Sequence, residues 1–343
     1  MTTRFNVRKK VLGNLSSARF VTRNGHAKTS SGPAGISPPK TNEPVVIDTM
    51  MFGEPEMMAA HLLPGAKPAI VDPGPANRAS DVIEGLDALG IDQLDSIILT
   101  HIHFDHAGAA AILAERYPGA TVYIHSRVAK HLADPTRLTE SVKAVWGEAT
   151  EDLFGFPASI DPDRIESLED GDRIDLGDRS LETIATPGHT RAHMSFYDEK
   201  TTAVLCGDAL GLQMPGSRII RPASPPADYS REDAIASVNR LRAKHPSSLH
   251  LAHFGLARQD PEATCDRAIL AINDWHESFL NKRESSVGEE DLLRRVNACV
   301  EAKLEPVPPS VRRGFEAVNP TWLNVAGMTG ELERAQARFS DAA

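Results

Sequence analysis

The chain has 343 residues, of which 41% are hydrophobic and 24% charged, a composition typical of a globular protein with a sizeable core. Its formal net charge is −10, and its three cysteines are widely separated, which argues against a disulfide framework or a zinc–thiolate motif and favours a reducing, cytoplasmic location. No apolar run approaches the ~20 residues of a membrane span, so we expect no membrane partner.

Residues 1–42 differ from the rest because they carry eight basic residues and no acidic one. The net charge therefore splits into +8 here and −18 in the remainder. Few apolar residues and a Gly/Pro/Ser stretch at 30–39 predict a flexible basic tail outside the fold. Such a segment is also typical of a mitochondrial transit peptide, which leaves a mitochondrial location as the alternative. The acidic remainder argues against nucleic acid as a partner.

The segment 43–258 alternates between strand and helix patterns. Its first half predicts strands over 45–47, 57–63, 69–71, 96–100 and 121–125, and helices over 77–89, 107–117, 126–131 and 137–148. Its second half predicts β-structure over 168–185, 194–197, 203–206 and 248–252, and a helix over 230–244. This order suits two sheets between helices. After Pro261 the pattern is helical, with breaks near 284–288 and 306–309, which predicts a C-terminal helical extension over 259–343.

The segment 100–108, reading THIHFDHAG, contains four potential metal ligands directly after a predicted buried strand. In an extended segment, residues i and i+2 point the same way, so His101 and His103 can bind one metal together. Asp105 and His106 follow the turn and can reach a neighbouring position. Imidazole and carboxylate ligands suit zinc, and also iron or manganese. The carboxyl end of a strand is where open α/β sheets bind ligands.

Three further polar side chains follow later strands in the same way. His189 ends the sequence TPGH, Asp208 lies in CGDA, and His253 lies in LAHFG. Each comes after a predicted apolar strand, so we expect all three at the sheet edge that holds the first motif.

Together, HxHxDH, PGH, GD and a final strand-end histidine resemble the metallo-β-lactamase superfamily of hydrolases over about residues 44–255. The resemblance implies an α+β fold, a four-layer αββα sandwich, and a site for two metals. It implies three histidine ligands for the first metal: His101, His103 and His189. It implies three ligands for the second metal, Asp105, His106 and His253, with Asp208 bridging both.

The implied cofactors are two divalent ions, zinc in first place and iron or manganese as the other choices. Two ions ~3.5–4 Å apart can share one hydroxide that attacks a carbonyl. We therefore predict a dinuclear zinc hydrolase that cleaves an ester, thioester or lactone of a small molecule, with Asp105 and Asp208 as its catalytic carboxylates.

Substitutions separate the branches of this superfamily. His103 stands where flavodiiron-like members carry Glu, and Asp208 stands where the main zinc β-lactamases carry Cys, which favours the glyoxalase II-like and lactonase-like branch. The alternative is a persulfide dioxygenase-like enzyme with one iron, whose ligands match His101, His189 and Asp208. Asp72, in the turn VDPG, resembles a family residue that supports the site.

The sequence says little about the substrate. Two candidates for substrate contacts are His193, four residues after His189 in GHTRAH, and Tyr229, since a tyrosine near the metals often assists lactonases of the superfamily. For His193 the alternatives are contact with a ligand or a structural hydrogen bond. Five apolar residues are candidates for a pocket lining: Phe104, Trp146, Phe156, Leu212 and Met214. The apolar face of the helix predicted after Pro261 can cap the sandwich, cover the site or form a homodimer.

Overall fold

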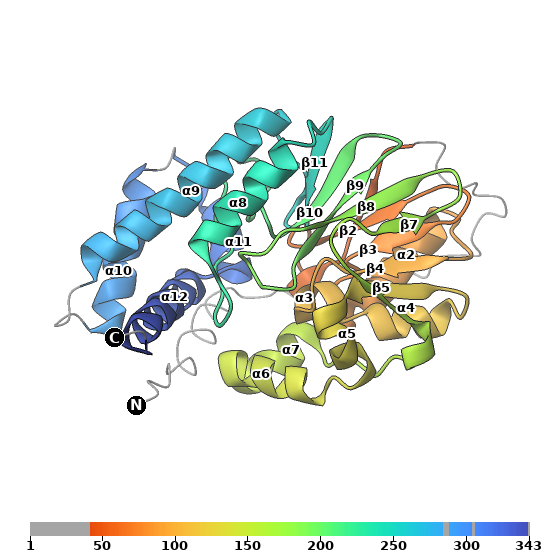
Figure 1. The fold of residues 1–343 in the computed structure, drawn as a ribbon, viewed down its shortest axis with the longest axis horizontal. Coiled ribbons are helices and arrows are strands. Elements are labelled where there is room, and N and C mark those ends of the chain that lie inside the picture. Colours follow the sequence, from red (N-terminus) through yellow and green to blue (C-terminus); the bar gives the residue numbers. More distant parts are fainter. Residues whose placement is uncertain (1–41, 284–287, 304–305, 342–343) are drawn as a thin grey trace.

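A computed structural model describes residues 42–283, 288–303 and 306–341, so the predicted tail over 1–42 lies outside the described residues except for its last position. The chain from residue 45 to residue 256 forms two six-stranded sheets that pack face to face between layers of helices (Figure 1). The predicted four-layer αββα sandwich, with helices following it, is confirmed.

The first sheet has the order β1-β2-β3-β4-β5-β6, antiparallel up to β3 and parallel beyond it. Its strands are β1 (Val45–Asp48), β2 (Ala59–Leu63), β3 (Ala69–Val71), β4 (Ser96–Ile98), β5 (Thr121–His125) and β6 (Ile165–Leu168). The helices α2 (Ala79–Ala88), α4 (Ala110–Arg116) and α5 (Ser126–Ala133) cover its outer face. Val82 and Leu86 of α2 share one apolar cluster with Ile70 and Ile97 because residues four apart lie on one helix face.

The second sheet has the order β12-β11-β10-β9-β8-β7, antiparallel except between β10 and β11. Its strands are β7 (Arg173–Asp175), β8 (Ser180–Ala185), β9 (Met194–Asp198), β10 (Ala203–Gly207), β11 (Ser248–Leu251) and β12 (Gly255–Leu256). The helices α8 (Arg231–Arg242) and α9 (Pro261–Lys282) cover its outer face. Ser230 caps α8, and Asp260 caps α9 just before Pro261, as their side chains accept backbone N–H groups.

The two sheets meet in an apolar layer that includes Ile98 and Leu63 of the first sheet and Phe196 and Leu205 of the second, each at most 1% exposed. Ile97, next to Ile98, faces the helices instead, since neighbouring strand residues point to opposite faces. Burial on both faces explains why these strands appear in the sequence as continuous apolar runs.

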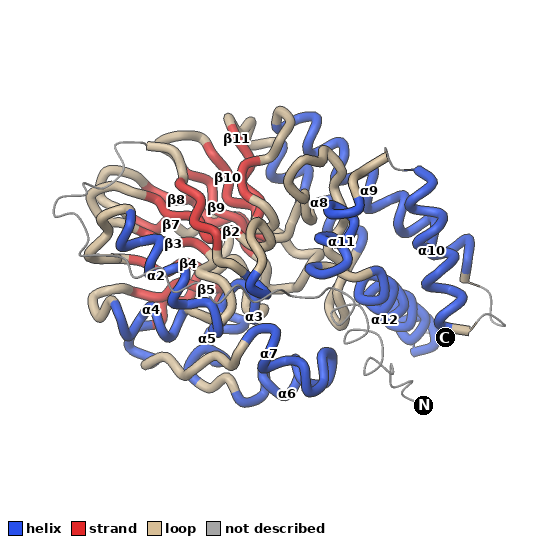
Figure 2. Tube along the Cα trace, turned by 180° about the vertical axis from the view of Figure 1, so that it is seen from behind, coloured by secondary structure: helices blue, strands red, loops and turns tan. Residues whose placement is uncertain are grey.

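The C-terminal helices pack on the second sheet. They are α9, α10 (Glu289–Lys303), α11 (Pro309–Val318) and α12 (Thr321–Asp341). Phe279 of α9 and Met328 of α12 share one apolar cluster with Leu249 and Leu251 of β11. Figure 2 shows α8 to α12 gathered on the side of β10 and β11. No helix within the described ranges is both long and apolar enough to span a bilayer.

Several predicted boundaries differ from the structure. The helix predicted over 107–117 is the shorter α4, and a separate helix, α3 (Phe104–Ala107), begins within the ligand motif. Between the two, Gly108 packs against Ala76, where a Cβ would meet the Ala76 nitrogen at 2.6 Å. The helix predicted over 137–148 is α6 (Thr136–Trp146), and a further helix that was not predicted, α7 (Thr150–Phe154), follows it. The strand over 248–252 is not the last, since the two-residue β12 follows it and is too short to show a period.

Candidate metal centre

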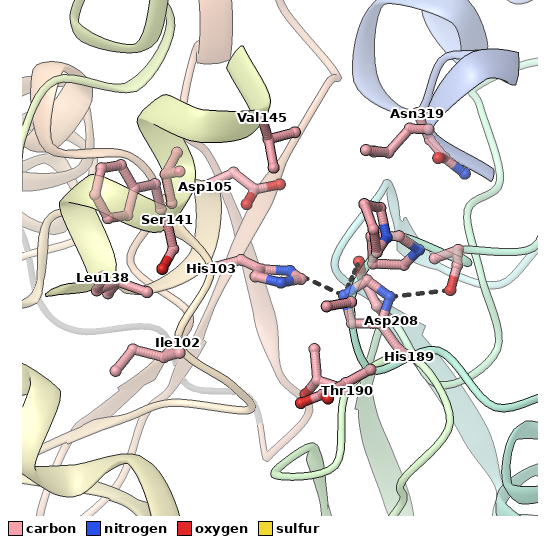
Figure 3. Close-up of a pocket in the computed structure, with 18 of the residues that line it drawn as sticks. Ile102, His103, Asp105, Leu138, Ser141, Val145, His189, Thr190, Asp208 and Asn319 are labelled. Atoms are coloured by element: carbon pink, nitrogen blue, oxygen red, sulfur yellow. Dashed lines mark hydrogen bonds and ion pairs between the residues drawn. The ribbon is translucent and has the colours of Figure 1, made fainter. Parts of the chain in front are cut away.

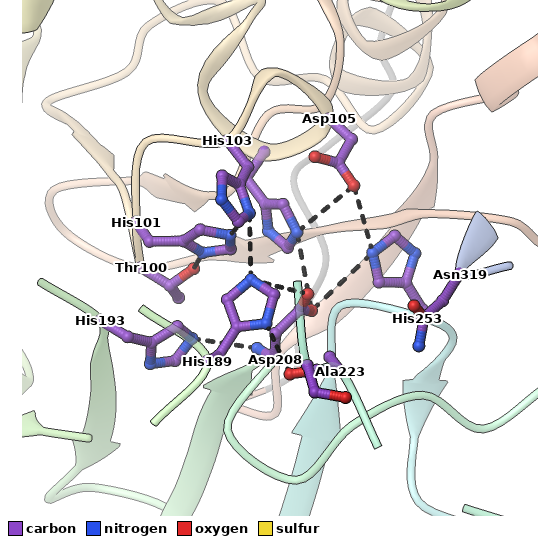
Figure 4. Close-up of polar contacts among 12 residues, drawn as sticks. Thr100, His101, His103, Asp105, His189, His193, Asp208, Ala223, His253 and Asn319 are labelled. Carbon is purple, nitrogen blue, oxygen red and sulfur yellow. Dashed lines mark hydrogen bonds and ion pairs between the residues drawn. The ribbon is translucent and has the colours of Figure 1, made fainter. Parts of the chain in front are cut away.

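The seven predicted ligands lie together at the carboxyl ends of strands (Figure 4). His101 and His103 lie in the loop after β4, and Asp105 and His106 lie in the short helix α3 that follows it. The loops after β8, β10 and β11 carry His189, Asp208 and His253. β8 and β10 run the same way because both are antiparallel to β9, and β11 is parallel to β10. Gly188 turns the chain sharply before His189, at φ 133°, where a Cβ would meet the backbone of Ala234 at 2.4 Å.

Three histidines form the first ligand group. The Nδ1 atom of His103 lies 2.9 Å from Nε2 of His101 and 3.0 Å from Nε2 of His189. A proton on one of these nitrogens can satisfy only one of the two contacts. A shared cation would satisfy all three lone pairs, so the group fits a metal ion.

The second group consists of Asp105, His106 and His253. The Oδ2 atom of Asp105 lies 3.7 Å from Nε2 of His106 and 3.6 Å from Nε2 of His253. These separations are too long for hydrogen bonds, but ligands about 2 Å from one ion lie roughly 3–4 Å from each other. Nε2 of His106 is fully buried and has no hydrogen-bond partner among the described residues, which again fits a metal ion.

Asp208 lies between the two groups. Its Oδ2 atom is 3.5 Å from Nε2 of His189, and its Oδ1 atom is 3.6 Å from Nε2 of His106 and 3.8 Å from Nε2 of His253. Each carboxylate oxygen therefore faces a different group, and Oδ1 is buried without a hydrogen-bond partner in the described part of the chain. This is the arrangement that the predicted bridging role requires.

The outer ring nitrogens are held by protein oxygens. Nδ1 of His189 donates to the carbonyl of Ala223 at 3.0 Å, and Nδ1 of His253 donates to the carbonyl of Met57 at 2.7 Å. A proton fixed on Nδ1 leaves the Nε2 lone pair of each ring facing the centre, which is the tautomer that a metal ligand needs. The sequence did not identify these partners, since a backbone carbonyl has no residue-specific signal.

Asp72 organises the other half of the site. It lies after β3, is 1% exposed, and adopts a positive φ of 52°. Its Oδ1 atom accepts the backbone N–H of Thr100 at 2.8 Å, while Oδ2 accepts the Thr100 hydroxyl at 2.7 Å and Nδ1 of His106 at 2.9 Å. Because the Thr100 hydroxyl donates its proton to Asp72, the hydroxyl oxygen can accept a hydrogen bond from Nδ1 of His101 at 3.0 Å. One carboxylate therefore orients two predicted ligands.

The electrostatics of the site favour bound positive charge. Burial lowers the pKa of His101 well below its usual value and that of His103 to about 3, with neighbouring histidines adding to the effect. Burial alone would raise the pKa of Asp208, but nearby His106 and His189 hold it well below its usual value. Burial likewise opposes the charge on His106, yet the carboxylates of Asp208, Asp105 and Asp72 raise its pKa well above the usual value.

His193 supports the predicted ligands from behind, since its ring centroid lies 5.1 Å from that of His101 and 5.9 Å from that of His189. Its Nε2 atom accepts the backbone N–H of Asp208 at 3.0 Å, and its Nδ1 atom pairs with the hydroxyl of Thr186 at 2.8 Å. Gly207, at φ 51°, permits this approach, since a Cβ there would meet Nε2 of His193 at 2.6 Å. The side chain is 0% exposed, so the expectation of a substrate contact by His193 is not met.

Tyr229 also lies away from the site. Its side chain is 1% exposed in the apolar cluster behind the second sheet, where burial raises its pKa. It does not line the cavity described below, because the helices α8 and α12 enclose it, and the expectation of a substrate contact is again not met.

A cavity of about 400 Å³ opens onto the site, within the ~300–1,000 Å³ range of small-molecule pockets (Figure 3). Five of the predicted ligands reach it: His103, Asp105, His189, Asp208 and His253. Three of the five predicted apolar lining residues do so as well: Phe104, Trp146 and Leu212. The other two pack elsewhere, Met214 in a core cluster with Phe315 and Phe156 beneath Lys143.

An αββα sandwich with two adjoining His/Asp ligand groups at one strand edge, open to a cavity, defines a metallo-hydrolase-type protein. The model of the metallo-beta-lactamase superfamily matches residues 44–253. The chain belongs to this superfamily, as its motifs predicted.

Several curated relatives match over the same part of the chain. The metallo-beta-lactamase fold-containing protein ST1585 of Sulfurisphaera tokodaii is 30% identical over 207 residues, covering 59% of this chain and 74% of the relative. The uncharacterized protein YobT of Bacillus subtilis is 31% identical over 198 residues, covering 56% and 81%. A hydroxyacylglutathione hydrolase of Aeromonas hydrophila is 29% identical over 226 residues, covering 64% and 73%.

Solved structures show the same fold. The archaeal superfamily protein ST1585 superposes with a TM-score of 0.60 at 23% identity, covering 85% of this chain and 99% of that chain. The metallo-beta-lactamase family protein TTHA1429 from Thermus thermophilus superposes with a TM-score of 0.60 at 20% identity, covering 86% and 93%. This coverage extends past the segment 44–253, so part of the C-terminal helical arrangement is shared.

Proposed function

We propose that this protein is a zinc-dependent hydrolase with a dinuclear site, cleaving an ester, thioester or lactone bond of a small molecule. The observation that carries the proposal is the pair of ligand groups joined by Asp208 at the floor of an open cavity. The first group would hold one ion through His101, His103 and His189. The second would hold the other through Asp105, His106 and His253.

Divalent ions held by these residues would supply Lewis-acid polarisation of a carbonyl and a water molecule of lowered pKa. The protein itself contributes by orienting the ligand side chains. Asp72 and Thr100 fix the ring tautomers of His101 and His106, as described above. Burial opposes the charge on Asp105 and Asp208, but without bound ions the neighbouring histidines hold the pKa values of both carboxyl groups below the usual value. Both side chains are therefore available as the anions that a divalent ion needs as ligands. Asp105, with 20% of its side chain exposed, is the more accessible carboxylate.

The test is a substrate screen on the zinc-loaded protein with esters, lactones and thioesters, including an acylated glutathione because of the relatives that carry that name. We expect about two zinc ions per chain and turnover of at least one of these classes. The variants Asp208→Ala and His189→Ala should lose turnover while keeping a folded circular dichroism spectrum.

Turnover near the wild-type rate in either variant would contradict the assignment. One iron per chain, together with sulfite formed from a persulfide substrate, would instead identify the mononuclear dioxygenase-like alternative. Metal analysis therefore separates the two hypotheses first, and the sulfite assay then tests the dioxygenase-like alternative.

A further inference from the structure

The wall of the cavity opposite the strand edge is an apolar helix face. The helix α6 contains no buried residue, although it carries apolar residues along one face. Three of them pack partly against the apolar cluster of Phe104 and Phe154: Leu138, Val142 and Trp146. Five of its residues line the cavity at the i, i+3, i+4, i+7, i+8 spacing of a single face: Leu138, Ser141, Val142, Val145 and Trp146. Four of these five side chains are apolar, so the helix turns its hydrophobic face toward the space above the predicted metals (Figure 3).

The facing wall comes from the C-terminal helices. Val318 ends α11, and Leu323 lies in the first turn of α12. The two walls are joined by Trp146 and Trp322, whose ring centroids lie 5.3 Å apart in an edge-to-face arrangement. Val145 and Leu323 are partly buried and belong to none of the five apolar core clusters of the described residues, so the cavity is what their side chains face.

Few charged side chains line the part of the cavity between α6 and the C-terminal helices. Among its lining residues, all within the described ranges, Arg127 is the only lysine or arginine, and it is exposed at the rim. The one acidic residue apart from the predicted ligands is Asp228, which pairs with Arg191 at 3.3 Å. A strongly charged substrate would lose its hydration here without gaining ionic partners.

We infer that the substrate carries a bulky, uncharged, apolar group beside the bond that is cleaved, and that this group lies between α6 and the start of α12. The inference rests on the proposed function for the position of the reacting bond. An apolar group there would cover the apolar face of α6, which no other part of the described chain fully buries. The group can belong to the acyl part or to the alcohol part of the substrate, and both would be recognised by the same burial of apolar surface.

The inference is tested by calorimetry on the full zinc-loaded chain with two pairs of probes. One pair is hexanoate and acetate, which represent an acyl group, and the other is 1-hexanol and ethanol, which represent an alcohol. Each pair differs by four methylenes, and each buried methylene is worth up to about fourfold in affinity. In at least one pair we expect the six-carbon probe to bind at least about tenfold more tightly.

A matched pair of variants tests where the six-carbon group of the probe binds in the cavity. Val145→Asp puts a charge on the cavity face and should weaken six-carbon binding at least about tenfold, leaving the two-carbon probes within about twofold. Ala144→Asp adds the same charge at the exposed neighbouring position and should change neither. Leu323→Asp repeats the test from the opposite wall and serves if Val145→Asp does not fold.

Two binding results and one kinetic result would overturn the inference, and the binding results come first. One is six-carbon binding no tighter than two-carbon binding in both pairs, and the other is equal loss in Val145→Asp and Ala144→Asp. Different results would contradict the proposed function. Hydrolysis of acetyl esters without preference for longer groups keeps that function and removes this inference. Tight hexyl binding without hydrolysis of any substrate class keeps the apolar site and removes the function.

Discussion

The side chain of Asn324, in α12, holds the backbone at Ser224, next to the residue that supports a predicted metal ligand. Its Oδ1 atom accepts the Ser224 backbone N–H at 2.8 Å and the Ser224 hydroxyl at 2.7 Å. The carbonyl of the preceding residue, Ala223, accepts Nδ1 of His189. On the other side, Asn319 donates to the carbonyl of Pro222 at 2.7 Å. The C-terminal helices thus position a ligand carried by the second sheet.

We expect Asn324→Ala to lower both stability and zinc affinity. Both residues are fully buried, so the Ser224 N–H would lose its acceptor, at a cost of about 1–3 kcal/mol in the free energy of unfolding. Looser support of Ala223 should weaken zinc binding, measured by competition with a chelator. Glu333→Ala, on the exposed face of the same helix, is the control and should change neither quantity. Unchanged zinc affinity in Asn324→Ala would show that α12 does not position His189.

Two glycines of α12 make a second matched pair. Alanine is favoured over glycine in a helix by about 1 kcal/mol. At Gly327, however, a Cβ would meet the backbone oxygen of Ser224 at 2.0 Å, whereas at Gly330 it would meet only the flexible end of Arg334 at 3.2 Å. We expect Gly327→Ala to destabilise by about 1–3 kcal/mol and Gly330→Ala to be neutral or stabilising, both measured by denaturant unfolding. Equal effects at the two positions would argue against the close packing of α12 on the loop.

Asp72→Asn should damage the second ligand group more than the first. The amide can no longer accept from all three donors, so Nδ1 of His106 loses its acceptor and the ring can turn a protonated Nε2 toward the site. We expect zinc affinity at that position to fall about 10–100-fold, with the tautomer of His106 read from nitrogen NMR shifts. Asp92→Asn, at an exposed position, is the control. An unchanged tautomer together with full affinity would contradict the role of Asp72.

Removing ligands one at a time should count the metals. His253→Ala removes a ligand of the second group only, so the zinc content should fall from about two to about one per chain. Asp208→Ala removes a carboxylate that faces both groups and should weaken both positions. The measurement is elemental analysis after dialysis against a fixed low zinc concentration. Identical stoichiometry in the two variants would contradict the bridging position of Asp208.

A buried histidine pair behind the site should make stability depend on pH. The rings of His61 and His250 lie 5.5 Å apart between β2 and β11, and burial lowers the pKa of His250 to about 4 and that of His61 well below its usual value. The unfolded chain takes up these protons near pH 6.5 and the folded chain only at lower pH, so stability is lost as the pH falls from about 6.5 toward 4. Each histidine contributes up to about 1.4 kcal/mol per pH unit over that window.

The variant His250→Leu should reduce this dependence and leave the part contributed by His61. We expect no large loss of stability at pH 7, because Nδ1 of His250 has no hydrogen-bond partner among the described residues and Nε2 has only a long contact, 3.3 Å, with the Ser248 hydroxyl. Unfolding by denaturant at several pH values, with the zinc concentration held constant, measures the change. An unaltered slope between about pH 6.5 and 4 would show that His250 does not remain neutral in the folded protein.

The cavity was predicted only in part, and for a physical reason. Phe104 and Leu212 lie next to ligand loops, so their neighbourhood followed from the motif. His193 was a candidate for a substrate contact because it follows His189 by four residues, and Tyr229 because a tyrosine often assists lactonases of the superfamily. The hydrogen bonds of His193 and the apolar packing of Tyr229 turn both away from the cavity.

The sequence by itself determined the fold class and the predicted ligand set, because strand periodicity, turn glycines and a histidine or aspartate at each strand end are local patterns. Only the tertiary structure decided which oxygens hold the rings and what faces the predicted metals. Every residue has a backbone carbonyl, so the sequence does not mark those of Met57 and Ala223 as partners of the ligand rings. The contact of Trp146 with Trp322 joins helices that are far apart in the chain. Such contacts depend on how the layers pack, which no local pattern specifies.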